Sequence, residues 1–182
     1  MKPSIFRYGL IPVLLLGAVL PAVAADGGRR ITLSTPVSGV IRAIHVSGGE
    51  RVRAGEALIE LDDRTFRARV DRARAQRDKL RVVRDEARRE HERTRELYNR
   101  RVISRHDLQL SEIAAAGSEA DYTSARSELT EAEVALEYAT VRAPVDGEVV
   151  EVLVNTGETV VNQQQVTPML ILRGDGDPGQ AD

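Results

Sequence analysis

One pattern of proline, glycine and apolar residues occurs twice in this chain of 182 residues, and the second copy lies 108 positions after the first. Each copy reads as a turn, a short strand, a second turn and another short strand. The residues that match across this offset are Pro36 with Pro144, Val37 with Val145, Gly39 with Gly147, Val46 with Val154, Gly49 with Gly157, Glu50 with Glu158 and Val52 with Val160. One copy alone is too small to bury a face of its strands, so we expect both to fold together as one small β-sandwich.

The two halves of the sandwich are predicted over residues 31–62 and 141–173, and a long insertion separates them. Both halves are rich in β-branched residues that roughly alternate with polar ones, as in strands with one buried face. The predicted structural turns are Pro36, Gly39 and Gly49 in the first half and Pro144, Gly147 and Gly157 in the second. The residues GDGDPGQAD at 174–182 lack large apolar side chains, which predicts a disordered tail.

The insertion, residues 63–140, contains one glycine, Gly117, and no proline, which permits two long helices. In the second arm, residues suited to a buried seam step by three and four: Leu108, Ser111, Ala115, Ser118, Tyr122, Ala125, Leu129, Ala132, Leu136 and Ala139. In the first arm the seam is weaker, with Phe66, Ala73, Leu80, Ala87 and Thr94 every seven residues and Arg69, Gln76, Val83, Glu90 and Leu97 at the companion position. These patterns predict an α+β protein whose sandwich is split by an antiparallel coiled-coil hairpin.

The two arms of the predicted hairpin carry opposite charge. Residues 64–105 contain sixteen basic and seven acidic side chains, whereas residues 106–140 contain one basic and eight acidic side chains. An arginine-rich helix alone would suggest nucleic acid as a partner, but an acidic partner helix favours ion pairs between the arms, so no nucleic-acid binding is predicted. Exposed pairs stabilise little individually and would mainly fix the register of the arms.

The first 24 residues read as a secretory signal peptide. Lys2 and Arg7 precede an apolar run at 9–20, and the small residues AVA follow at 22–24. The alternative is an uncleaved membrane anchor, but the run is short for a membrane span and contains a proline. We therefore expect an exported chain whose signal peptide is cleaved.

The midpoint of the insertion is Val102, so residues 99–104 are predicted to form the tip of the hairpin. Asn99 tolerates a left-handed backbone and is predicted to end the first helix. Ser104, with an acidic residue three positions later, is predicted to be the N-cap of the second helix. Val102 and Ile103 are apolar at a place that the partner arm cannot cover, which favours contact with another protein.

The pieces PVSGVIRAIHVSGGERVRAGEALIELD and ATVRAPVDGEVVEVLVNTGETV, on either side of the helical arms, resemble periplasmic adaptor subunits, the membrane fusion proteins of HlyD/RND type. In that family the split sandwich resembles a lipoyl or biotinyl carrier domain and is called a barrel-sandwich hybrid. Members that dock onto an outer-membrane channel carry R-x-x-x-L-x-x-x-x-x-x-S at the hairpin tip, which matches Arg93, Leu97 and Ser104. The resemblance implies channel docking through these residues, with Val102 and Ile103 beside them.

The resemblance also implies partners and a location. The expected partners are a TolC-like outer-membrane channel protein, an inner-membrane transporter reached directly or through another subunit, and further copies of the chain in a ring. The expected location is the periplasm, and an association with the inner membrane stays open. The β-barrel and membrane-proximal domains of ordinary adaptors are expected to be missing here.

Two other classes of function compete with this interpretation. A lipoyl or biotinyl carrier holds its cofactor on a lysine between the half-motifs, but the lysines of this chain are Lys2 and Lys79, so no cofactor is predicted. The chain has no cysteine, and His45, His91 and His106 lack metal-ligand spacing, so no enzymatic or metal site is predicted either. The second alternative is a non-catalytic coiled-coil protein, or an adaptor remnant without a transport function.

Overall fold

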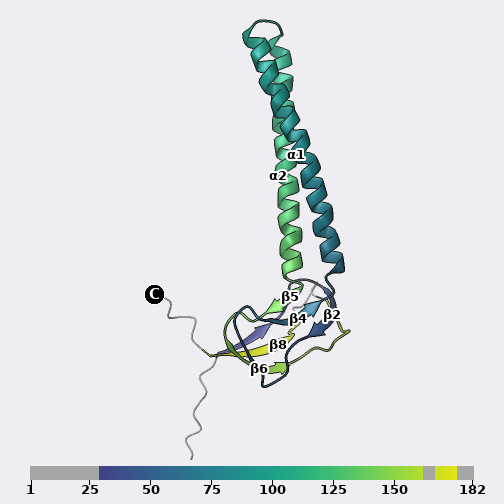
Figure 1. Ribbon diagram of the computed structural model, residues 1–182, viewed down its shortest axis with the longest axis vertical. Helices are drawn as coiled ribbons and strands as arrows, with labels where there is room; N and C mark the ends of the chain where they lie inside the picture. The colour runs from purple at the N-terminus through teal and green to yellow at the C-terminus, as the bar shows by residue number, and fades with distance from the viewer. Residues whose placement is uncertain (1–28, 162–166, 176–182) are drawn as a thin grey trace, which may run out of the picture.

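The computed structural model describes residues 29–161 and 167–175, in which a small β domain carries a helical hairpin that stands clear of it (Figure 1). The hairpin consists of α1 (Arg64–Asn99) and α2 (Arg105–Glu137). The predicted α+β fold, with a barrel-sandwich hybrid split by a coiled-coil hairpin, is confirmed. The predicted signal peptide and residues 176–182 of the predicted tail lie outside the described residues.

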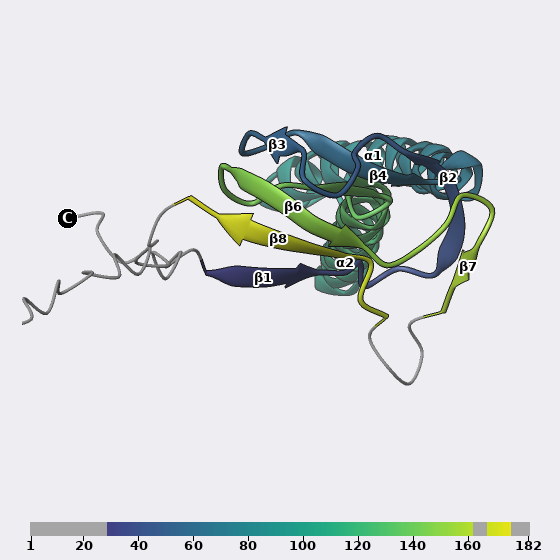
Figure 2. The ribbon, with the colours of Figure 1, turned by 90° about the horizontal axis from the view of Figure 1, so that it is seen from below.

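In the described part of the chain, eight short strands form two antiparallel sheets, and each sheet takes strands from both halves of the repeat (Figure 2). The first sheet has the order β1-β8-β6-β3 and the second has the order β5-β4-β2-β7. The strands of the first half are β1 (Arg30–Leu33), β2 (Gly39–Ile44), β3 (Arg51–Val52) and β4 (Ala57–Leu61). The strands of the second half are β5 (Thr140–Arg142), β6 (Gly147–Val152), β7 (Thr159–Val160) and β8 (Leu170–Gly174).

The second turn of each half is built in the same way. Gly49 and Gly157 have backbone φ angles of 85° and 86°, which glycine adopts without a steric cost. The carboxylate of the next residue, Glu50 or Glu158, accepts a hydrogen bond of 2.9 Å from a backbone N–H three residues earlier. The repeat in the sequence therefore extends to the hydrogen bonds of the turns.

Each of these turns bonds to the opposite half of the repeat. The Gly49 N–H donates to the Val149 carbonyl at 2.7 Å, and the Gly157 N–H donates to the Ile41 carbonyl at 2.8 Å. Ile41 and Val149 are themselves equivalent positions, because they differ by the same offset of 108. Neither half completes a sheet without the other, which explains why the fold needs both copies.

The glycines of the first predicted turn have a different role from the expected one. Pro36 and Pro144 lie in bends, but Gly39 and Gly147 are already the first residues of β2 and β6. A β-carbon on Gly147 would lie 2.2 Å from the carbonyl oxygen of Arg173 in β8. Gly147 is therefore required by the close approach of two strands, not by a turn conformation.

The core lies between the two sheets and extends to the base of the hairpin. Phe66, in the first turn of α1, packs against it. The Thr35 hydroxyl donates to the Tyr138 carbonyl at 2.7 Å, which ties the end of α2 to the first half of the sandwich. The largest side chains that are fully buried are Ile41, Leu58, Ile59, Leu61, Val149, Val160, Met169, Leu170 and Leu172.

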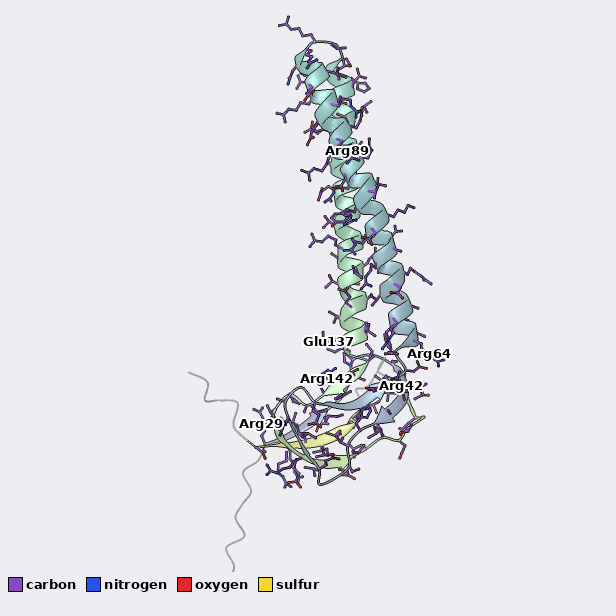
Figure 3. The ribbon with its side chains drawn as sticks, viewed as in Figure 1. Arg29, Arg42, Arg64, Arg89, Glu137 and Arg142 are labelled. Atoms are coloured by element: carbon purple, nitrogen blue, oxygen red, sulfur yellow. The ribbon has the colours of Figure 1, made fainter. Side chains whose placement is uncertain are left out.

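The two helices of the hairpin are 36 and 33 residues long, so the hairpin reaches about 50 Å from the sandwich. Its side chains project along the whole length, with Arg64 and Glu137 at the base and Arg89 high on α1 (Figure 3). The buried residues of α2 are Ser118, Ala125 and Leu129, which confirms the predicted seam of this helix.

In α1 the residues predicted every seven positions, Phe66, Ala73, Leu80, Ala87 and Thr94, are buried or half-buried as expected, and so is Leu97. The rest of the companion position lies one residue later than predicted, at Val70, Arg77, Arg84 and His91. Val83, predicted to face α2, is 48% exposed, whereas Arg84 does face it. The guanidinium carbon of Arg84 lies 4.2 Å from the centre of the Tyr122 ring, and His91 Nδ1 lies 3.0 Å from Ser111 Oγ. Because the seam of α2 consists largely of Ala and Ser, a long arginine stem fills the space between the helices better than valine does.

The predicted ion lattice between the arms is sparse. Among the described residues, the ion pairs that join the two helices are Arg74 with Glu133 at 3.7 Å and Arg84 with Glu119 at 3.8 Å. Most other ion pairs of α1 lie within that helix or join it to the residues just before it. The hairpin is therefore held mainly by its seam, including the stacking of arginine on tyrosine, and much of the opposite charge stays outside ion pairs.

Candidate docking site at the hairpin tip

The tip is a five-residue connection that reverses the chain without glycine or proline. Asn99 is the last residue of α1, as predicted, but the left-handed residue is Arg101, with a φ angle of 61°. The Arg101 N–H donates to the Tyr98 carbonyl at 2.8 Å, and the Val102 N–H donates to the Leu97 carbonyl at 3.0 Å. These two bonds form a Schellman motif, in which glycine is the residue usually found at the left-handed position.

The start of α2 is fixed by a capping box. The Asp107 N–H donates to Ser104 Oγ at 3.2 Å, and the Ser104 N–H donates to Asp107 Oδ2 at 3.1 Å. The Ser104 hydroxyl also donates to Asp107 Oδ2, at 2.7 Å. These hydrogen bonds from Ser104 lower the pKa of the Asp107 carboxyl, so the carboxylate acceptor is kept until the pH falls below the ordinary range of aspartate. The prediction that Ser104 is the N-cap of α2 is confirmed.

Replacing Ser104 with alanine should destabilise the hairpin by about 1 kcal/mol, because the Asp107 N–H loses its acceptor and the Asp107 carboxylate loses a donor. Thermal unfolding followed by circular dichroism measures the change. Ser127→Ala is the matched control, since the Ser127 hydroxyl bonds only to a backbone carbonyl within α2. An equal effect of the two substitutions would contradict a capping role.

The predicted docking residues lie in the tip or in the last two turns of α1, and they differ in what they expose. Val102 is 66% exposed, Ile103 and Leu97 are half-buried, and Ser104 is engaged in the capping box. Arg93, one turn below Leu97, holds Glu90 at 2.5 Å and remains largely exposed. The structure therefore brings three apolar side chains to the apex, with a charged one beneath them. Their docking role stays a prediction.

Two apolar residues near the tip were missed by the sequence analysis. Leu110 is 52% exposed and Ile113 is 61% exposed, both on α2 and on the side away from its seam. They are three positions apart, so they lie on one face of the helix. The signal was present in the sequence, because both residues fall between the seam positions Leu108, Ser111 and Ala115.

Arginine dominates the charge of the tip. Residues 93–107 contain five arginines and two carboxylates. In the part of the chain that the structure describes, no carboxylate lies within ion-pair distance of Arg95, Arg100, Arg101 or Arg105. The tip therefore presents apolar side chains bordered by positive charge.

The three histidines lie in different surroundings. His45 pairs with Glu60 on the sandwich at 3.2 Å, His91 lies in the hairpin seam, and His106 lies at the start of α2. Within residues 29–161 and 167–175, no cluster of three or more His, Asp or Glu side chains is placed to hold a metal ion. Over the same ranges, no helix combines the length and apolar character needed to cross a membrane.

Comparison with known sequences gives a family match over most of the chain. The family described as RND MFP, barrel-sandwich hybrid domain, matches residues 29–172. Multidrug resistance protein MdtA from Yersinia enterocolitica is 28% identical over 157 residues, which are 86% of this chain and 34% of that protein. The chain thus spans about a third of the length of the curated relatives that it matches.

Comparison with solved structures gives the same fold at lower identity. A MacA-MexA chimera with the α-hairpin domain of Pseudomonas aeruginosa MexA matches with a TM-score of 0.58 and 23% identity, over 80% of this chain and 46% of the chimera. The membrane fusion protein Spr0693 from Streptococcus pneumoniae R6 matches with a TM-score of 0.60 and 18% identity, over 80% of this chain and 59% of that protein. Both likenesses concern the split sandwich with its hairpin.

Proposed function

Because the chain belongs to the barrel-sandwich hybrid domain family of the RND membrane fusion proteins, we propose that it is a periplasmic adaptor of an efflux or secretion complex. In this role it links an inner-membrane transporter, directly or through another subunit, to an outer-membrane channel. The name of the relative MdtA, a multidrug resistance protein, favours efflux. The adaptor works by contact and carries out no chemical step.

The observation that carries this proposal is the exposed apolar turn at the far end of the hairpin. Val102 is 66% exposed at a point about 50 Å from the sandwich core, where no other described element of the chain covers it. Exposed apolar residues grouped at one end of a rigid element mark a contact with another protein. Arg93, Leu97 and Ser104 stand at the spacing of the channel-docking motif, and they are the proposed docking residues together with Val102 and Ile103.

We propose that several copies of the chain stand side by side in a ring when they meet the channel. The two helices of one hairpin carry opposite charge, and only a small part of that charge forms ion pairs between them. The basic helix α1 of one copy can face the acidic helix α2 of the next copy, which favours a ring in which all copies have the same orientation.

Two substitutions at the tip test the docking proposal. Arg93→Asp and Leu97→Ser should each abolish capture of a TolC-like channel from the same genome, purified in detergent, by the immobilised protein. The helical circular dichroism signal should stay nearly unchanged, because both changes lie at the end of a long hairpin. Surface plasmon resonance measures the capture.

The chain provides a matched control for each substitution. Arg93 forms an ion pair with Glu90, three residues earlier, at 2.5 Å. Arg89 forms an ion pair with Glu86 at the same spacing and distance, but it lies one turn nearer the sandwich. Leu80 is half-buried on the seam, as Leu97 is, but lies near the middle of α1. Arg89→Asp and Leu80→Ser should retain capture. Wild-type capture by both tip variants would rule out docking through the tip.

A further inference from the structure

The exposed apolar side chains near the tip are not confined to the turn. Leu110 and Ile113 lie on one side of the first turns of α2, and Ile113 is about as exposed as Val102 at the apex. Ile113 lies eight residues after Arg105, the first residue of α2, so it is about 12 Å along this helix from its start. An end-on contact confined to the turn would leave both side chains in water, so their exposure is unexplained by the tip motif alone.

The charge around this surface is positive. Arg100, Arg101 and Arg105 surround the turn, and among the described residues none of them has a carboxylate within ion-pair distance. Elsewhere on α1 several arginines are bound by an acidic residue of the same helix, as Arg89 is by Glu86. Among the described residues, Arg72, Arg81 and Arg88 of α1 likewise have no carboxylate within ion-pair distance, so the tip differs in that its unpaired arginines border an exposed apolar turn at the end of the hairpin.

The backbone of Arg101 gives an independent indication. Its φ angle of 61° is one that a β-branched or bulky residue rarely adopts, and glycine would hold the same turn without strain. Strained positions of this kind concentrate at functional sites. An arginine in this place is consistent with a need for its guanidinium group at the apex.

We propose that the channel-docking surface extends about two turns down α2 to Ile113, and that the partner presents apolar side chains bordered by carboxylates. This inference rests on the proposed docking function and names the chemistry of the partner. Leu110 and Ile113 supply apolar contact beside the apex, while Arg100, Arg101 and Arg105 pair with the carboxylates. The partner therefore overlaps the side of the hairpin and does not only touch its end.

The experiment compares two double substitutions that are matched in exposure. Leu110→Gln with Ile113→Gln removes side chains that are 52% and 61% exposed, and Val82→Gln with Val83→Gln removes side chains that are 62% and 48% exposed in the middle of α1. The first pair should weaken capture of the detergent-purified channel at least about tenfold, and the second should change it by less than about twofold. Glutamine keeps the helix and the net charge, so both proteins should fold as wild type does.

A second experiment tests whether the partner presents carboxylates to the arginines of the tip. Arg100→Gln with Arg105→Gln should weaken capture strongly at about 50 mM salt, and the difference from wild type should shrink at about 500 mM, because salt screens exposed charges. A difference that stays constant over this range would overturn the acidic character of the partner.

The remaining outcomes separate the inference from the docking proposal. If Arg93→Asp loses capture but the Leu110 and Ile113 variant keeps it, docking stands and its extension down α2 is wrong. If no tip variant loses capture, or the wild type captures no channel, both are wrong.

Two other results would assign the surface to a different partner. If the Leu110 and Ile113 variant changes sedimentation of the free protein, the surface is an interface between copies. If the wild type binds phosphatidylglycerol vesicles and the Leu110 and Ile113 variant does not, the surface is a lipid contact. Either of these last results would overturn the inference.

Discussion

Replacing Gly147 with alanine should lower the free energy of unfolding by about 3 kcal/mol. The new β-carbon would lie 2.2 Å from the carbonyl oxygen of Arg173 and 3.0 Å from the α-carbon of Gly174. Both contacts are with the backbone of β8, so no side chain can rotate to relieve them. β6 and β8 must separate, which breaks their ladder where Gly147 pairs with Gly174. Chemical denaturation measures the loss, and faster hydrogen exchange of the β6 amides locates it.

Two other glycines are matched controls for this prediction. A β-carbon on Gly39, the equivalent position in the first half, would lie 3.2 Å from the Leu61 Cδ2 atom, which is the end of a flexible side chain. Gly39→Ala should therefore cost about 1 kcal/mol or less. A β-carbon on Gly117 meets nothing within 4 Å, so Gly117→Ala should stabilise α2 by about 1 kcal/mol. A similar loss at all three positions would contradict a specific clash at Gly147.

Replacing Leu58 with alanine should also lower the free energy of unfolding by about 3 kcal/mol, because it leaves a cavity in the centre of the sandwich. Leu58 lies in β4, next to the hairpin in sequence, and is 0% exposed. Equilibrium denaturation in urea measures the change. Leu153→Ala is the control, since Leu153 is 39% exposed and should cost less than about 1 kcal/mol. Equal costs would mean that the sandwich core does not control the stability of the chain.

The sandwich was predictable because its two halves repeat. An offset shared by several pairs of residues is strong evidence even when each pair is common, and Gly49 with Gly157 shows why. Both glycines adopt the same positive φ angle, and both are followed by a glutamate that closes the turn. Such turns depend on local chemistry, so sequence alone reveals them. The steric role of Gly147 was not predictable, because the clash comes from Arg173, which is far away in the chain.

The register of α1 and the geometry of its end were harder to predict. The choice between Val83 and Arg84 at the seam depends on which side chain fills the space beside Tyr122, and hydrophobicity alone favours the wrong one. The left-handed residue was expected at Asn99, since asparagine tolerates that conformation, but it is Arg101. The hydrogen bonds of the Schellman motif decide that position, and they depend on where the last turn of the helix ends.

The exchange of hydrogen bonds between the two halves of the sandwich has a consequence for the order of folding. Neither sheet can form until both halves have been synthesised, and the ends of a flexible connection of this length would meet slowly. Contacts between neighbouring turns of α1 and α2 are closest in sequence at the tip, so we expect the hairpin to nucleate there and to close toward its base. Closure then delivers β4 and β5 to each other, already in place to pair. The turn at residues 100–104, proposed as the contact with the channel, is thus also the place where folding should begin.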